Sequence, residues 1–135
     1  MSSQLQQIQD RFLIEELVRR YGHYFDDGNL EGYFGLFAED ARVDIGAGET
    51  DKTGMMEQIR VNAEAVAGTH TRHFITNLVL DELTDEAASG AAYFLFTQTI
   101  EGVLQPGMTG TYQFNLRRTA TGWRIANWQA KSDRS

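Results

Sequence analysis

Two side chains capable of chemistry, His73 and Asn77, lie within a segment of strand-forming residues, Thr71–Leu80 (TRHFITNLVL). A neutral imidazole is an effective base near neutral pH, which makes His73 a candidate general base. A histidine on a strand can also face solvent or pack as a structural residue, and Asn77 can simply bond the backbone or orient a neighbour. The chemistry of this segment therefore depends on the elements that surround it.

The N-terminal half of the chain is predicted to be mainly helical. Residues 3–26 form the longest helix, which Ser2 or Ser3 can cap and which the turn-forming sequence DDGN ends at 26–29. Further elements are expected as helices over 30–37 and 55–68, a strand over 41–45 and a loop over 46–54 with room for a second short strand. The apolar stripe of the long helix consists of Leu5, Ile8, Phe12, Leu17, Tyr21 and Phe25, widened by Ile14 and Val18.

The second half is predicted to form four long strands separated by turns. Helices followed by antiparallel strands predict an α+β domain whose helices pack on one face of a strongly curved sheet. The sole proline, Pro106, is expected in the second turn, where it cannot interrupt a ladder. The strand-like segments cover residues 69–84, 87–103, 108–118 and 122–130, and the turns occupy 85–86, 105–107 and 120–122.

A sheet that wraps around a long helix forms a cone, whose wide end can stay open as a ligand pocket. Because side chains alternate along a strand, His73, Ile75, Asn77 and Val79 are expected to share one face, with Phe74 on the other. Both faces are substantially apolar, and the alternation is compatible with either one lining the cone. The remaining face would pack on a second subunit, which predicts a homo-oligomer, a dimer or a trimer, through the convex side of the sheet.

Composition and charge exclude several classes of protein. The 135 residues fit a single domain, 1–135, with 41% hydrophobic residues to fill its core. The absence of cysteine rules out disulfides and thiolate chemistry and suits a cytoplasmic location. The net charge of −7 argues against nucleic acid as a partner, and the arginines within 116–124 are interpreted as a solvated hairpin end.

Neither a membrane partner nor a metal is expected. No apolar run is long enough to cross a bilayer, and no basic and apolar N-terminal segment indicates a signal peptide. The three histidines and the acidic residues show no metal-ligand spacing.

Four stretches spread over nearly the whole chain carry a resemblance: 20–44 (RYGHYFDDGNLEGYFGLFAEDARVD), 72–80 (RHFITNLVL), 110–119 (GTYQFNLRRT) and 122–127 (GWRIAN). In these stretches the chain resembles the SnoaL-like branch of the nuclear-transport-factor-2-like superfamily, which contains scytalone dehydratase, bile-acid 7α-dehydratase and hexachlorocyclohexane dehydrochlorinase. The resemblance implies a cone-shaped α+β barrel with N-terminal helices packed in a curved, mainly antiparallel sheet. This fold hosts many activities, so it implies no single reaction.

The resemblance also implies a catalytic set. In the dehydratase and dehydrochlorinase members, an aspartate at the end of the first helix pairs with a histidine on the first long strand, and these positions match Asp26 and His73. A tyrosine five residues before the aspartate matches Tyr21, and an asparagine four residues after the histidine matches Asn77. Simpler roles remain for the same residues, with Asp26 or Asp27 as a turn residue and Tyr21 as a core tyrosine.

Asp26, His73 and Tyr21 have side chains that could act together in acid–base catalysis. A carboxylate on one imidazole nitrogen fixes the tautomer and stabilises the imidazolium, and a phenol can donate a hydrogen bond to a substrate oxygen. Five residues of regular helix correspond to about 140° of rotation, so Tyr21 and Asp26 would not share a face. The arrangement therefore requires Asp26 just beyond the last regular turn.

At two positions the sequence differs from relatives of known activity, and each difference argues against one class of reaction. Asp44 is about one position out of register for the acid of the ketosteroid isomerases, and a slip of one position turns a side chain to the opposite face. Asn127 or Trp128 occupies the place of a basic residue in the dehydrochlorinase. These departures argue against steroid isomerisation and against halide elimination.

The sequence therefore predicts a cofactor-independent lyase, most specifically a dehydratase, that acts on a small hydrophobic substrate such as a polycyclic compound or a ring ketone. His73 would act as the base, Asp26 would orient it, and Tyr21 would polarise the carbonyl or assist the leaving group. The residues expected to contact substrate are Asn77 and the pocket walls Phe25, Phe34, Phe74 and Trp128. The alternatives are an isomerase or polyketide-cyclase-like enzyme with the same base, and a non-catalytic small-ligand-binding or assembly module.

Overall fold

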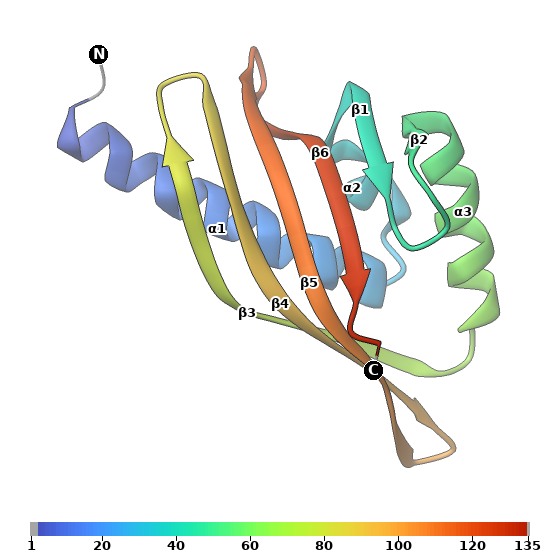
Figure 1. Cartoon of the computed structure of the whole chain (residues 1–135). Helices are drawn as coiled ribbons and strands as arrows, with labels where there is room; N and C mark the ends of the chain where they lie inside the picture. Colours follow the sequence, from blue (N-terminus) through green and yellow to red (C-terminus); the bar gives the residue numbers. More distant parts are fainter. Residues whose placement is uncertain (1–2, 135) are drawn as a thin grey trace.

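The helices and the sheet form two layers of an α+β fold (Figure 1). The structure, a computed structural model, describes residues 3–134. The six strands form one curved, open sheet in the order β2-β1-β6-β5-β4-β3, in which β1 and β6 run parallel and the other neighbours antiparallel. This architecture confirms the predicted cone. In chain order the elements are α1 (Gln4–Asp26), α2 (Leu30–Gly35), β1 (Phe37–Asp44), β2 (Thr50–Asp51), α3 (Lys52–Ala65), β3 (His70–Leu83), β4 (Ala87–Ile100), β5 (Val103–Thr119) and β6 (Gly122–Ser132).

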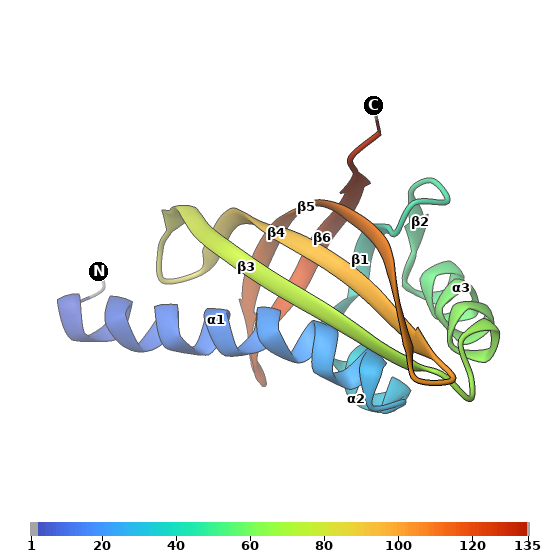
Figure 2. The ribbon, with the colours of Figure 1, turned by 90° about the horizontal axis from the view of Figure 1, so that it is seen from below.

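The long helix α1 crosses one face of the sheet, beneath β3, and ends beside α2 (Figure 2). Ser3 caps its start by accepting a hydrogen bond from the backbone N–H of Gln6 at 3.0 Å. Ser2, the other expected cap, lies outside the described residues. The helix ends at Asp26, and Gly28 follows in a left-handed conformation with φ of 73°.

The predicted apolar stripe of α1 is correct only in its second half. Leu17 and Tyr21 are buried, whereas Leu5 and Phe12 are 75% and 66% exposed. The step of five residues from Phe12 to Leu17 rotates the stripe by about 140°, so the first residues lie on another face of the helix. The buried face continues instead through Ile14 and Asp10.

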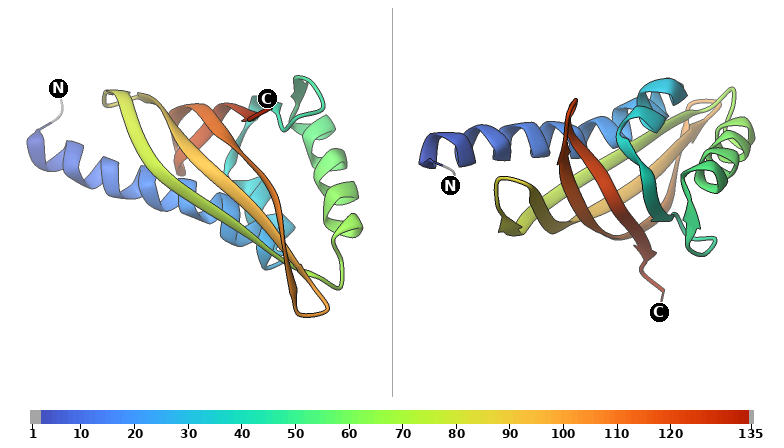
Figure 3. Two further views of the ribbon diagram at one scale, coloured as in Figure 1. Left: turned by 60° about the horizontal axis from the view of Figure 1, so that its bottom comes forward. Right: turned by 90° about the horizontal axis from the view of Figure 1, so that it is seen from above.

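The helix α3 begins at Lys52, earlier than residue 55, because Asp51 caps it by accepting a hydrogen bond from the Gly54 N–H at 2.8 Å. It ends at Ala65 rather than continuing to Gly68. Both views in Figure 3 place α3 beside β1 and β2, at the opposite end of the molecule from the start of α1. The start of α1 and the helix α3 therefore lie at opposite ends of the cone.

The hairpin between β4 and β5 turns at Glu101 and Gly102, so the predicted turn at residues 105–107 is wrong. Both turn residues have positive φ, 49° and 79°, as a tight two-residue hairpin requires. Pro106 instead lies within β5, opposite Thr97, where the register of the ladder shifts. A proline is tolerated in a strand at such an irregularity.

A β-bulge in β3 changes which side chains share a face. The register with β4 shifts between Thr76 and Val79, and Asn77 adopts a left-handed conformation with φ of 55°. The inner face therefore continues from Ile75 to Leu78 rather than to Asn77 and Val79. The expectation that His73 shares its face with Asn77 and Val79 is wrong for this reason.

Arg118, near the β5–β6 turn, is a structural residue, whereas the exposed Arg117 fits the predicted solvated hairpin end. Arg118 Nη2 donates to Asp10 Oδ2 at 2.6 Å, and Asp10 is fully buried. Asp10 Oδ1 accepts from Trp123 Nε1 at 3.3 Å and from Gln6 Nε2 at 3.0 Å. We call these four residues the Asp10 cluster. It joins the start of α1 to the end of β5 and the start of β6.

None of the helices in residues 3–134 is long and apolar enough to cross a membrane.

Candidate active site

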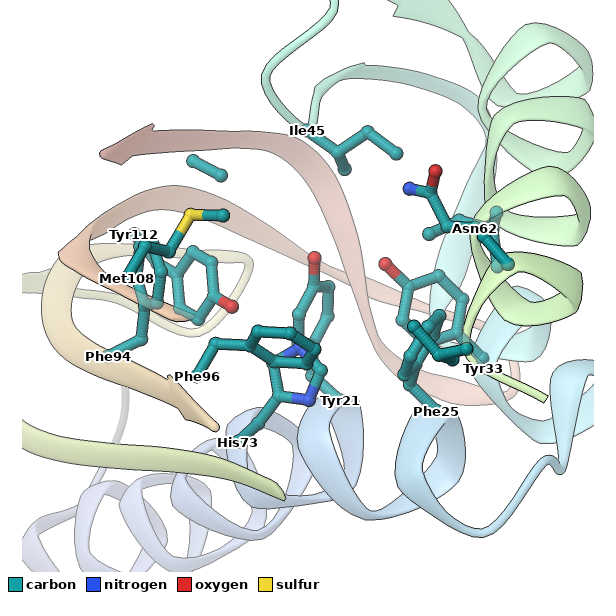
Figure 4. A pocket seen from close by; sticks show the side chains of 14 residues that line it. Tyr21, Phe25, Tyr33, Ile45, Asn62, His73, Phe94, Phe96, Met108 and Tyr112 are labelled. Atoms are coloured by element: carbon teal, nitrogen blue, oxygen red, sulfur yellow. The ribbon is translucent and has the colours of Figure 1, made fainter. Parts of the chain in front are cut away.

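A cavity of about 320 Å³ lies between the end of α1, α3 and the concave face of the sheet (Figure 4). The polar residues in its lining are His73, Asn62, Tyr21, Tyr33 and Tyr112. Apolar and aromatic side chains make up the rest of the lining. A mainly apolar cavity with a few convergent polar groups is typical of a small-molecule site.

The structure brings His73 and Asp26 together. His73 Nδ1 lies 2.8 Å from Asp26 Oδ1, and the His73 backbone N–H donates to Asp26 Oδ2 at 2.7 Å. The Thr71 hydroxyl donates to Asp26 Oδ1 at 2.7 Å. The carboxylate is thus held by Thr71 and His73, which lie on the same face of β3, and its side chain is 8% exposed.

These contacts determine the charge of Asp26. Burial acts to raise the pKa of its carboxyl, but the His73 ring, the Thr71 hydroxyl and the His73 backbone N–H outweigh it and lower the pKa below its usual value. Asp26 is therefore ionised at neutral pH and can only accept hydrogen bonds. In the neutral ring, His73 Nδ1 must carry the proton, and Nε2 is left as the basic nitrogen.

The imidazole of His73 lines the cavity between aromatic rings. Its centroid is 4.8 Å from that of Phe96 and 5.3 Å from that of Phe25. Nε2 has no hydrogen-bond partner among residues 3–134. This nitrogen is therefore available to a molecule in the cavity.

A glycine on α1 allows β3 to approach closely at this point. A Cβ at Gly22 would lie 2.9 Å from His73 Cβ and 3.3 Å from the His73 carbonyl oxygen. Gly22 thus places the backbone of His73 within reach of the helix end that carries Asp26. Sequence reasoning did not single out this residue.

Tyr21 and Asp26 do not share a face of α1, yet both lie beside His73. Asp26 does not need to lie beyond the helix for this. Asp26 is the last residue of α1 and bonds the histidine from outside the cavity. Tyr21 faces the cavity, with its ring edge-on to the imidazole at 6.3 Å between centroids. The two side chains therefore reach His73 from different directions, as a rotation of about 140° dictates.

Three tyrosine hydroxyls converge in the cavity, and two of them belong to residues that sequence reasoning missed. Figure 4 shows the Tyr21 hydroxyl between those of Tyr33 and Tyr112. Burial raises the pKa of Tyr21 to about 12. Tyr21 also stacks on Trp128, with ring centroids 4.3 Å apart, so it is both a core residue and part of the cavity wall.

The other predicted contact residues divide into three groups. Phe25 lines the cavity as expected. Phe34 and Trp128 are buried in the core beneath it and do not line it. Phe74 is 51% exposed on the opposite face of β3, because its neighbour His73 takes the inner face, and Asn77 is exposed at the bulge. The structure therefore places Phe74 and Asn77 away from the cavity.

Sequence reasoning also missed Phe96, Asn62 and Met108 as lining residues. Phe96 pairs directly with His73 across the β3–β4 ladder, so strand pairing could have identified it. Asn62 comes from α3, whose position against the sheet no local pattern predicts. Asp44 accepts from the N–H groups of Gly46 and Gly48 at the end of β1 and lies outside the cavity lining.

Charged groups around the cavity are sparse. Within residues 3–134 no lysine or arginine lines it, and no cluster of three or more His, Asp or Glu side chains could hold a metal.

The curved sheet wrapped over α1, with a cavity at one end, defines a fold of the nuclear-transport-factor-2-like class. The SnoaL-like domain model matches residues 6–129, and the chain belongs to this family.

Several solved structures share this fold. A variant of a protein of unknown function from Mycobacterium tuberculosis is 25% identical with a TM-score of 0.86, and the match covers 96% of this chain and 79% of that one. A nuclear-transport-factor-2-like protein with a cystatin-like fold from Novosphingobium aromaticivorans is 22% identical with a TM-score of 0.83, covering 93% and 83%. A candidate aromatic ring hydroxylase from the same organism is 25% identical with a TM-score of 0.80, covering 95% and 92%. No curated protein is a significant match for the chain.

Proposed function

We propose that the chain is a cofactor-independent lyase that dehydrates a small hydrophobic ring ketone, with His73 as the general base. The observation that carries this proposal is the 2.8 Å contact between His73 Nδ1 and Asp26 Oδ1, which leaves Nε2 free at a cavity of about 320 Å³. An imidazole oriented by an ionised carboxylate is suited to take and return a proton. The name of the similar ring hydroxylase supports a ring-bearing ligand.

The reaction follows from these positions. His73 Nε2 removes a proton from the carbon next to the carbonyl, and the electrons of the broken C–H bond form an enolate. Asp26 stabilises the imidazolium, and Tyr21 donates a hydrogen bond to the enolate oxygen. When the enolate collapses, the bond from the β-carbon to its hydroxyl breaks, and the imidazolium protonates the departing oxygen to give water.

The test uses a panel of cyclic β-hydroxyketones, with loss of water followed by mass spectrometry. We expect His73→Ala to abolish turnover, and Asp26→Asn to reduce it by about 10²–10⁴, the range typical of acid–base groups. Tyr21→Phe should cost less, because it removes one hydrogen bond and no proton acceptor. His23→Ala is the matched control, since His23 is an exposed histidine on α1, the helix that carries Asp26 and Tyr21.

The outcomes separate the alternatives. Full activity in His73→Ala would end the proposal. Conversion without loss of water that still depends on His73 would indicate an isomerase or a polyketide-cyclase-like enzyme with the same base. Binding of ring ketones without any turnover would indicate a non-catalytic small-ligand-binding or assembly module.

We also propose that a second copy of the chain covers the outer face of the sheet, as a dimer or a trimer. In Figure 1 no helix of residues 3–134 lies over this face. It exposes large apolar side chains, including Phe74 at 51%, Val79 at 55% and Tyr93 at 58%. Sedimentation at micromolar concentration should show an oligomer that Tyr93→Lys dissociates and that Val61→Lys, on α3, does not. A monomeric wild-type protein would contradict this assembly.

The cytoplasmic location and the absence of nucleic-acid and membrane partners stay predictions from the sequence.

A further inference from the structure

A second cavity lies directly outside the one that holds His73. We call it the outer cavity, with a volume of about 580 Å³, and the cavity at His73 the inner cavity. The two share the lining residues Ile45, Asn62, Phe94, Met108 and Ala130. Figure 4 shows Ile45, Asn62 and Met108 on the side of the inner cavity away from His73. A molecule bound at His73 can therefore extend past these side chains into the outer cavity.

The outer cavity differs from the inner one in charge. Within residues 3–134 no lysine or arginine lines the inner cavity, whereas Arg134 lines the outer one. Arg134 Nε donates to Ser132 Oγ at 3.4 Å, and its guanidinium has no carboxylate partner among residues 3–134. The cation is therefore free to pair with an anionic group of a bound molecule.

One acidic residue also lines the outer cavity, but it comes from a different element. Glu57 lies on α3, whereas Arg134 follows the end of β6. An anion beside Arg134 would be attracted by the guanidinium and repelled by the carboxylate of Glu57. The affinity for an anionic molecule should therefore respond to these two side chains in opposite directions.

The inner cavity does not suit a permanent anion. It is mainly apolar, and the ionised Asp26 lies behind His73. A carboxylate there would lose its hydration and gain no cation in return. In the outer cavity the exposed Arg134 offers a counter-charge and leaves the carboxylate in contact with water. The two cavities together fit a molecule with an apolar ring at one end and an anion at the other.

We propose that the substrate is a ring ketone whose side chain ends in a carboxylate, with the ring in the inner cavity and the carboxylate at Arg134. This inference rests on the proposed function and deepens it by naming the substrate class. Arg134 binds the substrate and takes no part in proton transfer. It holds the substrate equally in the ground state and the transition state, so its loss should raise KM and leave kcat unchanged.

The test compares three ketones that share a naphthalene ring: 4-(2-naphthyl)-4-oxobutanoic acid, its methyl ester and 2-acetylnaphthalene. They carry no leaving hydroxyl, so calorimetry near neutral pH and at low ionic strength reports binding alone. We expect the acid to bind more tightly than the ester, with a difference that falls as salt is added. We expect 2-acetylnaphthalene to compete with the acid, because its ring occupies the same inner cavity.

Substitutions in the outer cavity test the role of Arg134. Arg134→Gln should weaken binding of the acid by about threefold to fivefold, the upper part of the range for exposed ion pairs, without weakening that of the ester. Glu57→Gln should strengthen binding of the acid slightly. Lys131→Gln is the matched control, since it removes the same charge from an exposed residue of β6 that lines neither cavity. It should leave the preference for the acid over the ester unchanged.

Three results would overturn the carboxylate site. The first is an acid that binds no more tightly than its ester. The second is an equal loss in Arg134→Gln and Lys131→Gln, which would indicate a general effect of net charge. The third is a failure of 2-acetylnaphthalene to compete, because the acid would then bind elsewhere.

The results also separate the carboxylate site from the base. A preference for the acid that depends on Arg134 and survives in His73→Ala supports the carboxylate site, even if His73→Ala retains turnover and the proposed base is wrong. Loss of turnover in His73→Ala without any preference for the acid overturns the carboxylate site and leaves the base in place.

Discussion

Asp10 and Asp26 lie on the same helix, yet their carboxylates have opposite surroundings. Asp10 is fully buried and bonds a permanent cation, an indole and an amide, none of which lines the cavity. Asp26 bonds an imidazole that can gain and lose a proton and whose second nitrogen borders the cavity. A buried carboxylate therefore has a structural role when its partner carries a permanent charge. It can support catalysis when its partner is an imidazole that borders a ligand cavity.

The largest expected effect is on stability at the Asp10 end. Asp10→Ala removes the buried carboxylate that Arg118 and Trp123 share, while the Arg118 side chain is 31% exposed and can be hydrated, so the free energy of unfolding should fall by about 1.5–3 kcal/mol. Denaturant unfolding measures this change directly.

The control for Asp10→Ala is Asp40→Ala. Asp40 bonds Arg117 at the same 2.6 Å, but its side chain is 74% exposed, so its removal should have no measurable effect. Equal effects of the two substitutions would show that burial does not distinguish these ion pairs.

A smaller effect is expected where α1 meets β3. Gly22→Ala places a methyl group 2.9 Å from His73 Cβ, which forces the strand away from the helix that carries Asp26. Overpacking typically costs about 1–3 kcal/mol, against a gain of about 1 kcal/mol in helix propensity. We therefore expect a net loss of stability by denaturant unfolding, together with reduced turnover.

Gly35→Ala provides the matched helical control, since a Cβ there would meet nothing within 4 Å. It should be neutral or slightly stabilising. If Gly22→Ala behaved in the same way, the close approach would not be needed to position His73.

Much of the fold and the pairing of His73 with Asp26 could be predicted from the sequence. Alternation and turn residues located the four long strands, and the family resemblance linked two residues far apart in the chain. The predictions that failed concern positions where the pairing between neighbouring strands is irregular. The bulge at Asn77 reverses the inner and outer faces of β3, and Pro106 lies in a strand because the ladder shifts there.

The rest of the site depends on how distant elements pack. Tyr33 and Tyr112 come from α2 and β5 and meet only when the sheet curves over α1. The Asp10 cluster joins the start of the chain to its last hairpin, a contact that no local pattern indicates. The spacing of four residues from Asp10 to Ile14 was the available signal, because it places a carboxylate on the face that the second half of α1 buries, and a buried carboxylate requires partners.

The central claim, that Asp26 orients His73 as a base toward the cavity, can be tested without a substrate. Long-range ¹H–¹⁵N NMR of the neutral imidazole reports which ring nitrogen carries the proton. The account predicts a proton on Nδ1 and a bare Nε2 in the wild-type chain, and loss of this preference in Asp26→Asn. A proton on Nε2 with a bare Nδ1 would show that the ionised carboxylate does not hold the ring, and would contradict the proposed dyad.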